Sequence, residues 1–113
     1  MTIKNLIDKD LFILLNEGAD TGRTISKPYC CDLLSIAMSG APADGIWFTV
    51  MANMNTIAVA TLTETACIVL ASGVTPDEAT LARARSEGLT VFRTELPVFD
   101  AAILFYETQK EFR

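Results

Sequence analysis

Ala66-Cys67-Ile68-Val69-Leu70-Ala71-Ser72-Gly73 is the stretch that decides the fold of this chain. Six small or apolar residues in a row, ended by a turn pair, are typical of a strand buried on both faces. The next segment, Thr75-Pro76-Asp77-Glu78, predicts a helix start, with Thr75 as the N-cap, Pro76 at the first helical position and Glu78 closing a capping box. Gly88 ends this helix, and Leu89 to Arg93 forms the next strand.

The alternation of strands and helices extends outward from this unit. Toward the N-terminus, the pattern predicts a helix over Ile57 to Leu62, capped by Asn53 or Asn55, and another over Leu33 to Met38. Strands are predicted over Ile46 to Met51 and over Tyr29 to Cys31. The chain before them is predicted to form a helix over Ile3 to Asp8 and a buried strand over Leu11 to Leu15. Toward the C-terminus, Pro97 opens a helix that runs to about Glu107, and residues 109–113 are expected to fray. We therefore predict one compact α/β domain over residues 1–113, with a largely parallel sheet of about four or five strands flanked by helices.

Composition narrows the classes of partner. The 113 residues carry 14 acidic and 9 basic side chains, a net charge of −5, which disfavours nucleic-acid polymers and anionic membranes. The first residues lack an export signal, no apolar run approaches the ~18 residues of a membrane span, and three cysteines argue against a disulfide scaffold. We expect a cytoplasmic protein. Half of the residues are hydrophobic, which hints at a subunit interface in so short a chain.

Catalytic and metal-binding motifs are missing from the sequence. It has no histidine, no phosphate-binding loop and no Gly-x-Gly-x-x-Gly fingerprint, so we expect neither an enzyme nor a cofactor. Cys30 and Cys31 are adjacent, and on a strand they would point to opposite faces, which makes a shared metal site unfavourable. Packed thiols are the preferred interpretation, with a redox-active thiol or a cluster shared across a dimer as the alternatives.

Five polar residues are candidates for ligand binding. Asn53 and Asn55 lie where a strand gives way to a helix, a position at which parallel α/β sheets bind ligands and helix N-termini attract anions. Asp32 can either cap the following helix or bind a ligand group. Thr49 lies within the predicted strand Ile46 to Met51, and Arg23 is a suitable clamp for phosphate or carboxylate. A small anion or a nucleotide is the ligand expected here.

Apolar side chains receive two interpretations. The aromatic residues Trp47, Phe48, Phe92, Phe99 and Phe105 are expected to pack in the core. The last helix presents Val98, Ala102 and Phe105 at helical spacing, and part of that face is expected to meet a second subunit.

The segment Tyr29-Cys30-Cys31-Asp32-Leu33-Leu34-Ser35 resembles the signature of the DRTGG domain family. Three further blocks resemble the same family in the same order, namely 47–50 with 53–62, 66–73 and 87–99. Arg23 can stand for the arginine of the motif that gives the family its name, but Lys27-Pro28 replaces its glycine pair. The glycines would let a backbone approach a ligand closely, and the replacement puts that capacity in doubt.

The resemblance implies a fold similar to the N-terminal domains of HPr kinase and of a muramyl ligase. It also implies a regulatory role, because DRTGG domains occur fused to phosphate acetyltransferases and to paired nucleotide-sensing modules. The first hypothesis is a non-catalytic, ligand-sensing homodimer. The alternative is an interaction or assembly protein for an iron–sulfur redox enzyme such as an iron-only hydrogenase, with which stand-alone members are associated. An enzyme whose site forms across a dimer ranks third.

Overall fold

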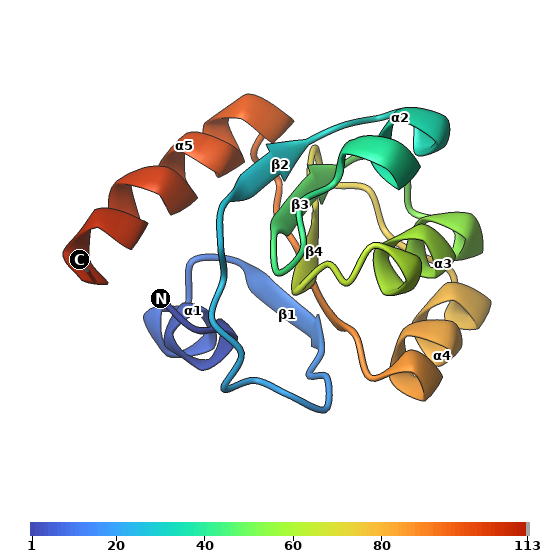
Figure 1. The fold of residues 1–113 in the computed structure, drawn as a ribbon, viewed down its shortest axis with the longest axis horizontal. Coiled ribbons are helices and arrows are strands. Elements are labelled where there is room, and N and C mark those ends of the chain that lie inside the picture. The colour runs from blue at the N-terminus through green and yellow to red at the C-terminus, as the bar shows by residue number, and fades with distance from the viewer. Residues whose placement is uncertain (113) are drawn as a thin grey trace.

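Five strands form one sheet in the order β1-β5-β4-β3-β2 in the computed structural model, which describes residues 1–112 (Figure 1). β2 to β5 are parallel to one another, and β1 runs antiparallel to β5 at the edge. In chain order the elements are α1 (Ile3–Lys9), β1 (Ile13–Asn16), β2 (Pro28–Cys30), α2 (Leu34–Gly40), β3 (Ile46–Thr49), α3 (Met54–Leu62), β4 (Cys67–Leu70), α4 (Glu78–Glu87), β5 (Thr90–Arg93), α5 (Val98–Gln109) and a 3-10 turn (Lys110–Phe112). The predicted fold class, a single α/β domain with a largely parallel sheet, is confirmed.

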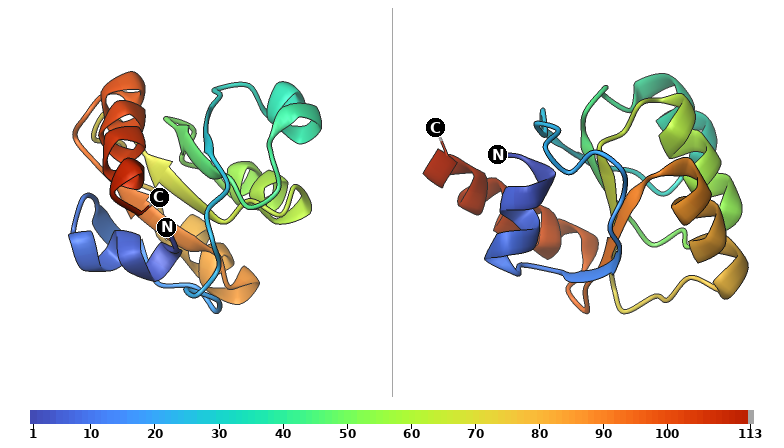
Figure 2. Two further views of the ribbon diagram at one scale, coloured as in Figure 1. Left: turned by 60° about the vertical axis from the view of Figure 1, so that its left-hand side comes forward. Right: turned by 90° about the horizontal axis from the view of Figure 1, so that it is seen from below.

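Helices cover both faces of the sheet. Figure 2 shows α2, α3 and α4 on one face, and α1 and α5 on the other. Alternate residues of the central strands serve the two faces: Ile68 and Leu70 belong to the cluster under α2, α3 and α4, whereas Cys67 and Val69 belong to the cluster under α1 and α5. Every residue of β3 and β4 is buried, as the unbroken apolar runs predicted.

The first strand differs from the prediction. It was expected to be buried over Leu11 to Leu15, but β1 occupies the sheet edge and its Ile13 side chain is 51% exposed. The buried residue of this run is Phe12, whose ring packs edge-on against Phe48 and Phe92. The apolar run therefore predicted the strand correctly but not its exposure. Whether a strand lies at the edge of a sheet depends on the order of the strands, which a local run does not reveal.

Helix ends supply two further corrections. The cap of α4 is Asp77, whose side chain accepts a hydrogen bond from the backbone N–H of Thr80, so the Thr75–Glu78 capping box is wrong. The last helix continues through Gln109 into the 3-10 turn, where fraying was predicted; Arg113 lies outside the described residues. Gly88 ends α4 as expected, in the left-handed conformation with φ 68°.

The face of α5 that was predicted to meet a second subunit is buried, and the opposite face is exposed. Phe105 is fully buried, and Val98 and Ala102 pack against the same core cluster, so this face covers the sheet. Phe99, expected in the core, is 71% exposed. Between residues 1 and 112, no helix has the length and apolar character needed to span a membrane.

Candidate functional site

Asp32 joins the loops that follow β2 and β3. Its Oδ1 atom accepts hydrogen bonds from the Thr49 hydroxyl at 2.7 Å and from the backbone N–H of Val50 at 2.9 Å. Thr49 is fully buried, and its hydroxyl oxygen also accepts the backbone N–H of Met51 at 3.2 Å. Asp32 and Thr49 are thus brought together at the carboxyl edge of the sheet, as a polar link between two loops.

This arrangement corrects one of the two roles predicted for Asp32. The helix after it begins at Leu34, and its N-cap, Leu33, provides no side-chain hydrogen bond. Asp32 therefore does not cap α2, because its carboxylate is turned toward the end of the neighbouring strand.

Asn53 and Asn55 lie at the start of α3, beside this link. Asn53 is the N-cap, and its Oδ1 atom accepts the backbone N–H of Thr56 at 3.1 Å, which confirms the predicted cap. Asn55 is exposed in the first turn. The nearby space between α3 and α4 measures about 10 Å³, enough for one water molecule at most.

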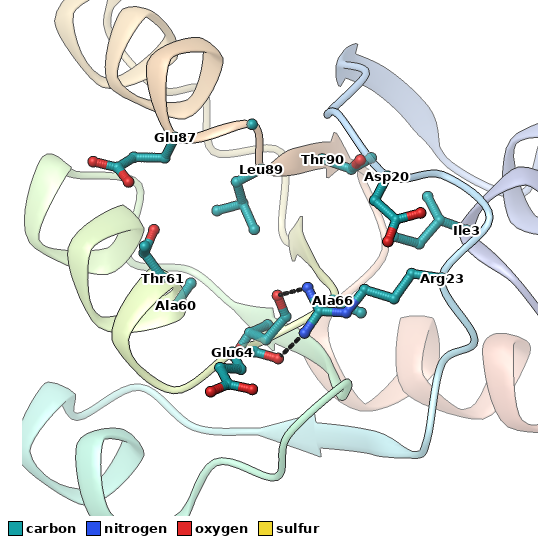
Figure 3. Close-up of a pocket in the computed structure, with 12 residues that line it drawn as sticks. Ile3, Asp20, Arg23, Ala60, Thr61, Glu64, Ala66, Glu87, Leu89 and Thr90 are labelled. Atoms are coloured by element: carbon teal, nitrogen blue, oxygen red, sulfur yellow. Dashed lines mark hydrogen bonds between the residues drawn. The ribbon is translucent and has the colours of Figure 1, made fainter.

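Arg23 lies at the opposite, amino edge of the sheet. Its guanidinium donates from Nε to Asp44 Oδ1 at 2.5 Å, from Nη1 to the carbonyl of Thr65 at 3.3 Å, and from Nη2 to the carbonyl of Glu64 (Figure 3). The structure therefore separates Arg23 from the other four candidate residues. Through these hydrogen bonds, Arg23 connects the loop before β2 to the loop between α3 and β4.

Arg23 borders a cavity of about 320 Å³ that sequence analysis did not predict. Figure 3 shows Asp20 and Arg23 entering from the loop before β2, with Thr61 and Glu87 on the far side. The complete lining comprises Ile3, Asp20, Arg23, Ala60, Thr61, Glu64, Thr65, Ala66, Glu87, Gly88, Leu89 and Thr90. Its volume falls at the lower end of the range for small-molecule sites.

The charges around this cavity are predominantly negative. Asp20, Glu64 and Glu87 line the cavity beside the guanidinium of Arg23. Two of these charges are already paired, Arg23 with Asp44 and Glu87 with Arg83 at 3.0 Å, which leaves the carboxylates of Asp20 and Glu64. Both α3 and α4 end here, and the C-terminal ends of helices carry partial negative charge. The cavity thus suits a ligand that presents a positive group or several hydrogen-bond donors.

The three cysteines lie in different surroundings. Burial raises the pKa of the Cys67 thiol, and the positive charge of Arg23 only partly offsets this. Partial burial and the negative charge of Asp32 raise the pKa of Cys30. The Cys31 thiol donates to the Leu33 carbonyl at 3.3 Å. A raised pKa lowers the thiolate fraction, so Cys30 and Cys67 are poor nucleophiles. Within residues 1–112, no group of three cysteine or acidic side chains converges as a metal site would require.

Comparison with known proteins identifies a similar fold. No protein-family model matches the chain, and no curated protein matches it. Among solved structures, a similar one comprises the CBS and DRTGG domains of the regulatory region of Clostridium perfringens pyrophosphatase, in complex with its activator diadenosine tetraphosphate. The TM-score is 0.70 and the sequence identity 15%, over 91% of this chain and 45% of that chain. The DRTGG-like fold implied by the resemblance is thereby confirmed.

Proposed function

We propose that this chain is a non-catalytic regulatory module that senses a small ligand and works as a homodimer. The observation that carries the proposal is the polar cavity at the amino edge of the sheet, with its volume of about 320 Å³. Its lining residues include threonines and carboxylates, which can hold a ligand by hydrogen bonds and charge. The sequence has no histidine to act as a general base beside a threonine hydroxyl, which favours binding over catalysis.

The ligand that we propose carries an amine or another positively charged group. Asp20 and Glu64 supply the attraction, since Glu87 is paired with Arg83, and the ends of α3 and α4 add to it. Arg23 does not reverse this balance, because Asp44 neutralises its charge and backbone carbonyls accept its remaining donors. Binding would connect three segments, the loop before β2 and the C-terminal ends of two helices, and would stabilise them against one another.

The anion or nucleotide expected from sequence is the competing ligand, at the carboxyl edge. Its support is the N-terminus of α3 beside Asn53 and Asn55, where backbone N–H groups favour an anion. The pyrophosphatase regulatory region, part of which has a similar fold, binds the activator diadenosine tetraphosphate. Against it, the one charged side chain of this predicted cluster is the carboxylate of Asp32. The balance of charge therefore favours the cavity and a cationic ligand.

Thermal-shift and calorimetric titrations with 1,4-diaminobutane, ATP and inorganic phosphate test the proposal. We expect the diamine to raise the melting temperature of the wild type and to lose this effect in the double variant Asp20→Asn and Glu64→Gln. The matched control, Asn53→Ala with Asn55→Ala, should keep the diamine response. A response to ATP that only the asparagine variant loses would place the site at the carboxyl edge. A wild type that responds to none of the three probes would contradict ligand sensing through these groups.

A second candidate function is assembly with another protein, for which the exposed side chains of Phe99, Ile36 and Leu33 provide support. An iron–sulfur redox enzyme is the partner that the family resemblance suggests. Affinity purification from the native host, followed by mass spectrometry, would test this. Recovery of the chain free of other proteins under gentle conditions would count against it.

A further inference from the structure

The outer edge of β2 is open for pairing. On its inner side, the carbonyl of Lys27 accepts the N–H of Ile46 at 3.0 Å, and the N–H of Cys31 donates to Phe48 at 3.4 Å. Backbone groups of successive strand residues point to opposite sides, so the N–H and C=O of Cys30 point away from β3. Since β2 ends the sheet order, the described chain places no further strand beyond it. Cys30 itself is exposed.

Apolar side chains flank this edge on both faces of the sheet. Leu33, the N-cap of α2, and Ile36, within this helix, are each 55% exposed. Gly40 shares their side of the helix, and a Cβ atom added there would lie 3.0 Å from the Tyr29 hydroxyl of β2, which places this side next to the edge strand.

On α5, Phe99 and Ile103 are 71% and 43% exposed, one helical turn apart. Glu111, in the 3-10 turn after α5, forms a 2.8 Å ion pair with Lys9, which places α1 beside the C-terminal end of α5. Figure 1 shows α2 and α5 on either side of β2. The exposed apolar side chains of the two helices are therefore expected along the outer edge of this strand.

Charge is depleted along this edge. Residues 28–43, which contain β2 and α2, include a single charged side chain, that of Asp32. The other edge of the sheet differs, because α1 beside β1 exposes Lys4, Asp8 and Lys9. Depletion of charge with exposed aromatic and aliphatic groups is the composition of the centre of a protein interface.

We propose that a second copy of this chain occupies the edge, with the two β2 strands antiparallel and Cys30 facing Cys30 of the other copy across a two-fold axis. The inference specifies the interface of the homodimer in the proposed function and in that sense rests on it. A two-fold axis makes the same patch serve both subunits, and an antiparallel pair of identical strands satisfies that symmetry. Pro28 has no N–H and can contribute only its carbonyl as an acceptor, so the ladder beyond the Cys30 pair is incomplete and side chains must supply most of the contact.

The exposed area is adequate for this purpose. With about 150–200 Å² for a full side chain of these sizes, the exposed fractions of Leu33, Ile36, Phe99 and Ile103 amount to about 400 Å² per subunit. A standard interface buries about 800 Å² per partner, of which about 57%, or about 450 Å², is apolar. The four side chains therefore approach the apolar content of a stable dimer, and the packing of identical faces requires no other protein.

Sedimentation and cross-linking of the full chain test the interface. We expect a wild-type dimer, and a dissociation constant raised about a hundredfold or more in Ile36→Glu and Phe99→Glu, because each two-fold contact would bury the new charge twice. Leu62→Glu is the matched control, because Leu62 is 70% exposed on α3, and this variant should remain dimeric. A monomeric wild type, a dimer unaffected by the two glutamates, or equal dissociation of the control would overturn the proposal.

Cross-linking tests the register separately. The α-carbons of a hydrogen-bonded antiparallel pair lie about 5.5 Å apart, within the range that a disulfide spans. Copper(II)–phenanthroline should accept two electrons as the two Cys30 thiols lose two protons and form an S–S bond. The covalent dimer should form in the wild type and be lost in Cys30→Ser. A stable dimer that never forms this bond would overturn the Cys30 register. Diamine titration of the same variants keeps the two proposals distinguishable, because loss of ligand response in an intact dimer would affect the sensing function alone.

Discussion

Replacement of Asp32 by alanine should destabilise the fold far more than loss of a helix cap would. The substitution removes two hydrogen bonds to one carboxylate oxygen, from the buried Thr49 hydroxyl and from the N–H of Val50. Hydrogen bonds to charged groups contribute about 1.5–3 kcal/mol each when protected from water, and the exposure of Asp32 reduces this. We expect a loss of about 2–3 kcal/mol. In a domain of this size, that corresponds to about 8–12 °C in melting temperature.

Chemical denaturation of four proteins measures this effect: wild type, Asp32→Ala, Thr49→Val and the double variant. Because the two side chains share a hydrogen bond of 2.7 Å, their substitutions should be non-additive by about 1 kcal/mol. Asp32→Asn keeps an acceptor oxygen and should cost less than alanine. A simple N-cap would lose about 1 kcal/mol of unfolding free energy in Asp32→Ala, and the losses of Asp32→Ala and Thr49→Val would add in the double variant. That result would refute the link between the loops.

Three other perturbations have expected outcomes. Gly18→Ala should lower the melting temperature strongly, because the new Cβ would lie 2.8 Å from a backbone nitrogen and closer still to the Gly88 carbonyl oxygen; an unchanged transition would show that the loop yields freely. Asn53→Ala should cost about 1 kcal/mol in urea unfolding, since it removes a cap, whereas Asn55→Ala should be nearly neutral; equal losses would contradict the assignment of Asn53 as the cap. Hydrogen bonds from the first turn of α4 lower the pKa of Asp77, so its contribution is present above the unfolded-state pKa of about 3.9 and disappears as the pH falls through the lower folded-state value. Asp77→Asn should therefore flatten the acid limb of the stability curve, and identical acid limbs would exclude this contribution.

Local sequence was sufficient wherever the deciding contact lies within a few residues. β4 was predictable because six consecutive small or apolar residues require burial on both faces, and Asn53 because its partner, Thr56, is three residues away. The cap of α4 shows the limit of this reasoning. Thr75 satisfied a sequence pattern, but Asp77 occupies the position from which a carboxylate reaches the N–H of Thr80.

Contacts that depend on strand order could not be derived in this way. Asp32 reaches Thr49, 17 residues later, only because β2 and β3 are neighbours in the sheet. The cavity at the amino edge is a stronger example, since Asp20, Glu64 and Glu87 belong to three separate connections. The sequence contained only a weak signal for this cavity. Glu64 and Glu87 each lie where a predicted helix is followed by a strand, and in a parallel sheet these helix-to-strand junctions lie at the same edge.

The pairing of β1 with β5 has a consequence for the order in which the chain assembles. Asn16 donates to the carbonyl of Leu89, 73 residues later, and the ring of Phe12 packs against Phe92. On the ribosome, β1 emerges before β5, its neighbour in the sheet, has been synthesised. The β2-to-β5 unit consists of successive neighbours, whereas closing a loop of this length delays pairing. β1 is therefore synthesised before the β2-to-β5 unit and docks after it, and until then its apolar side chains remain accessible to chaperones.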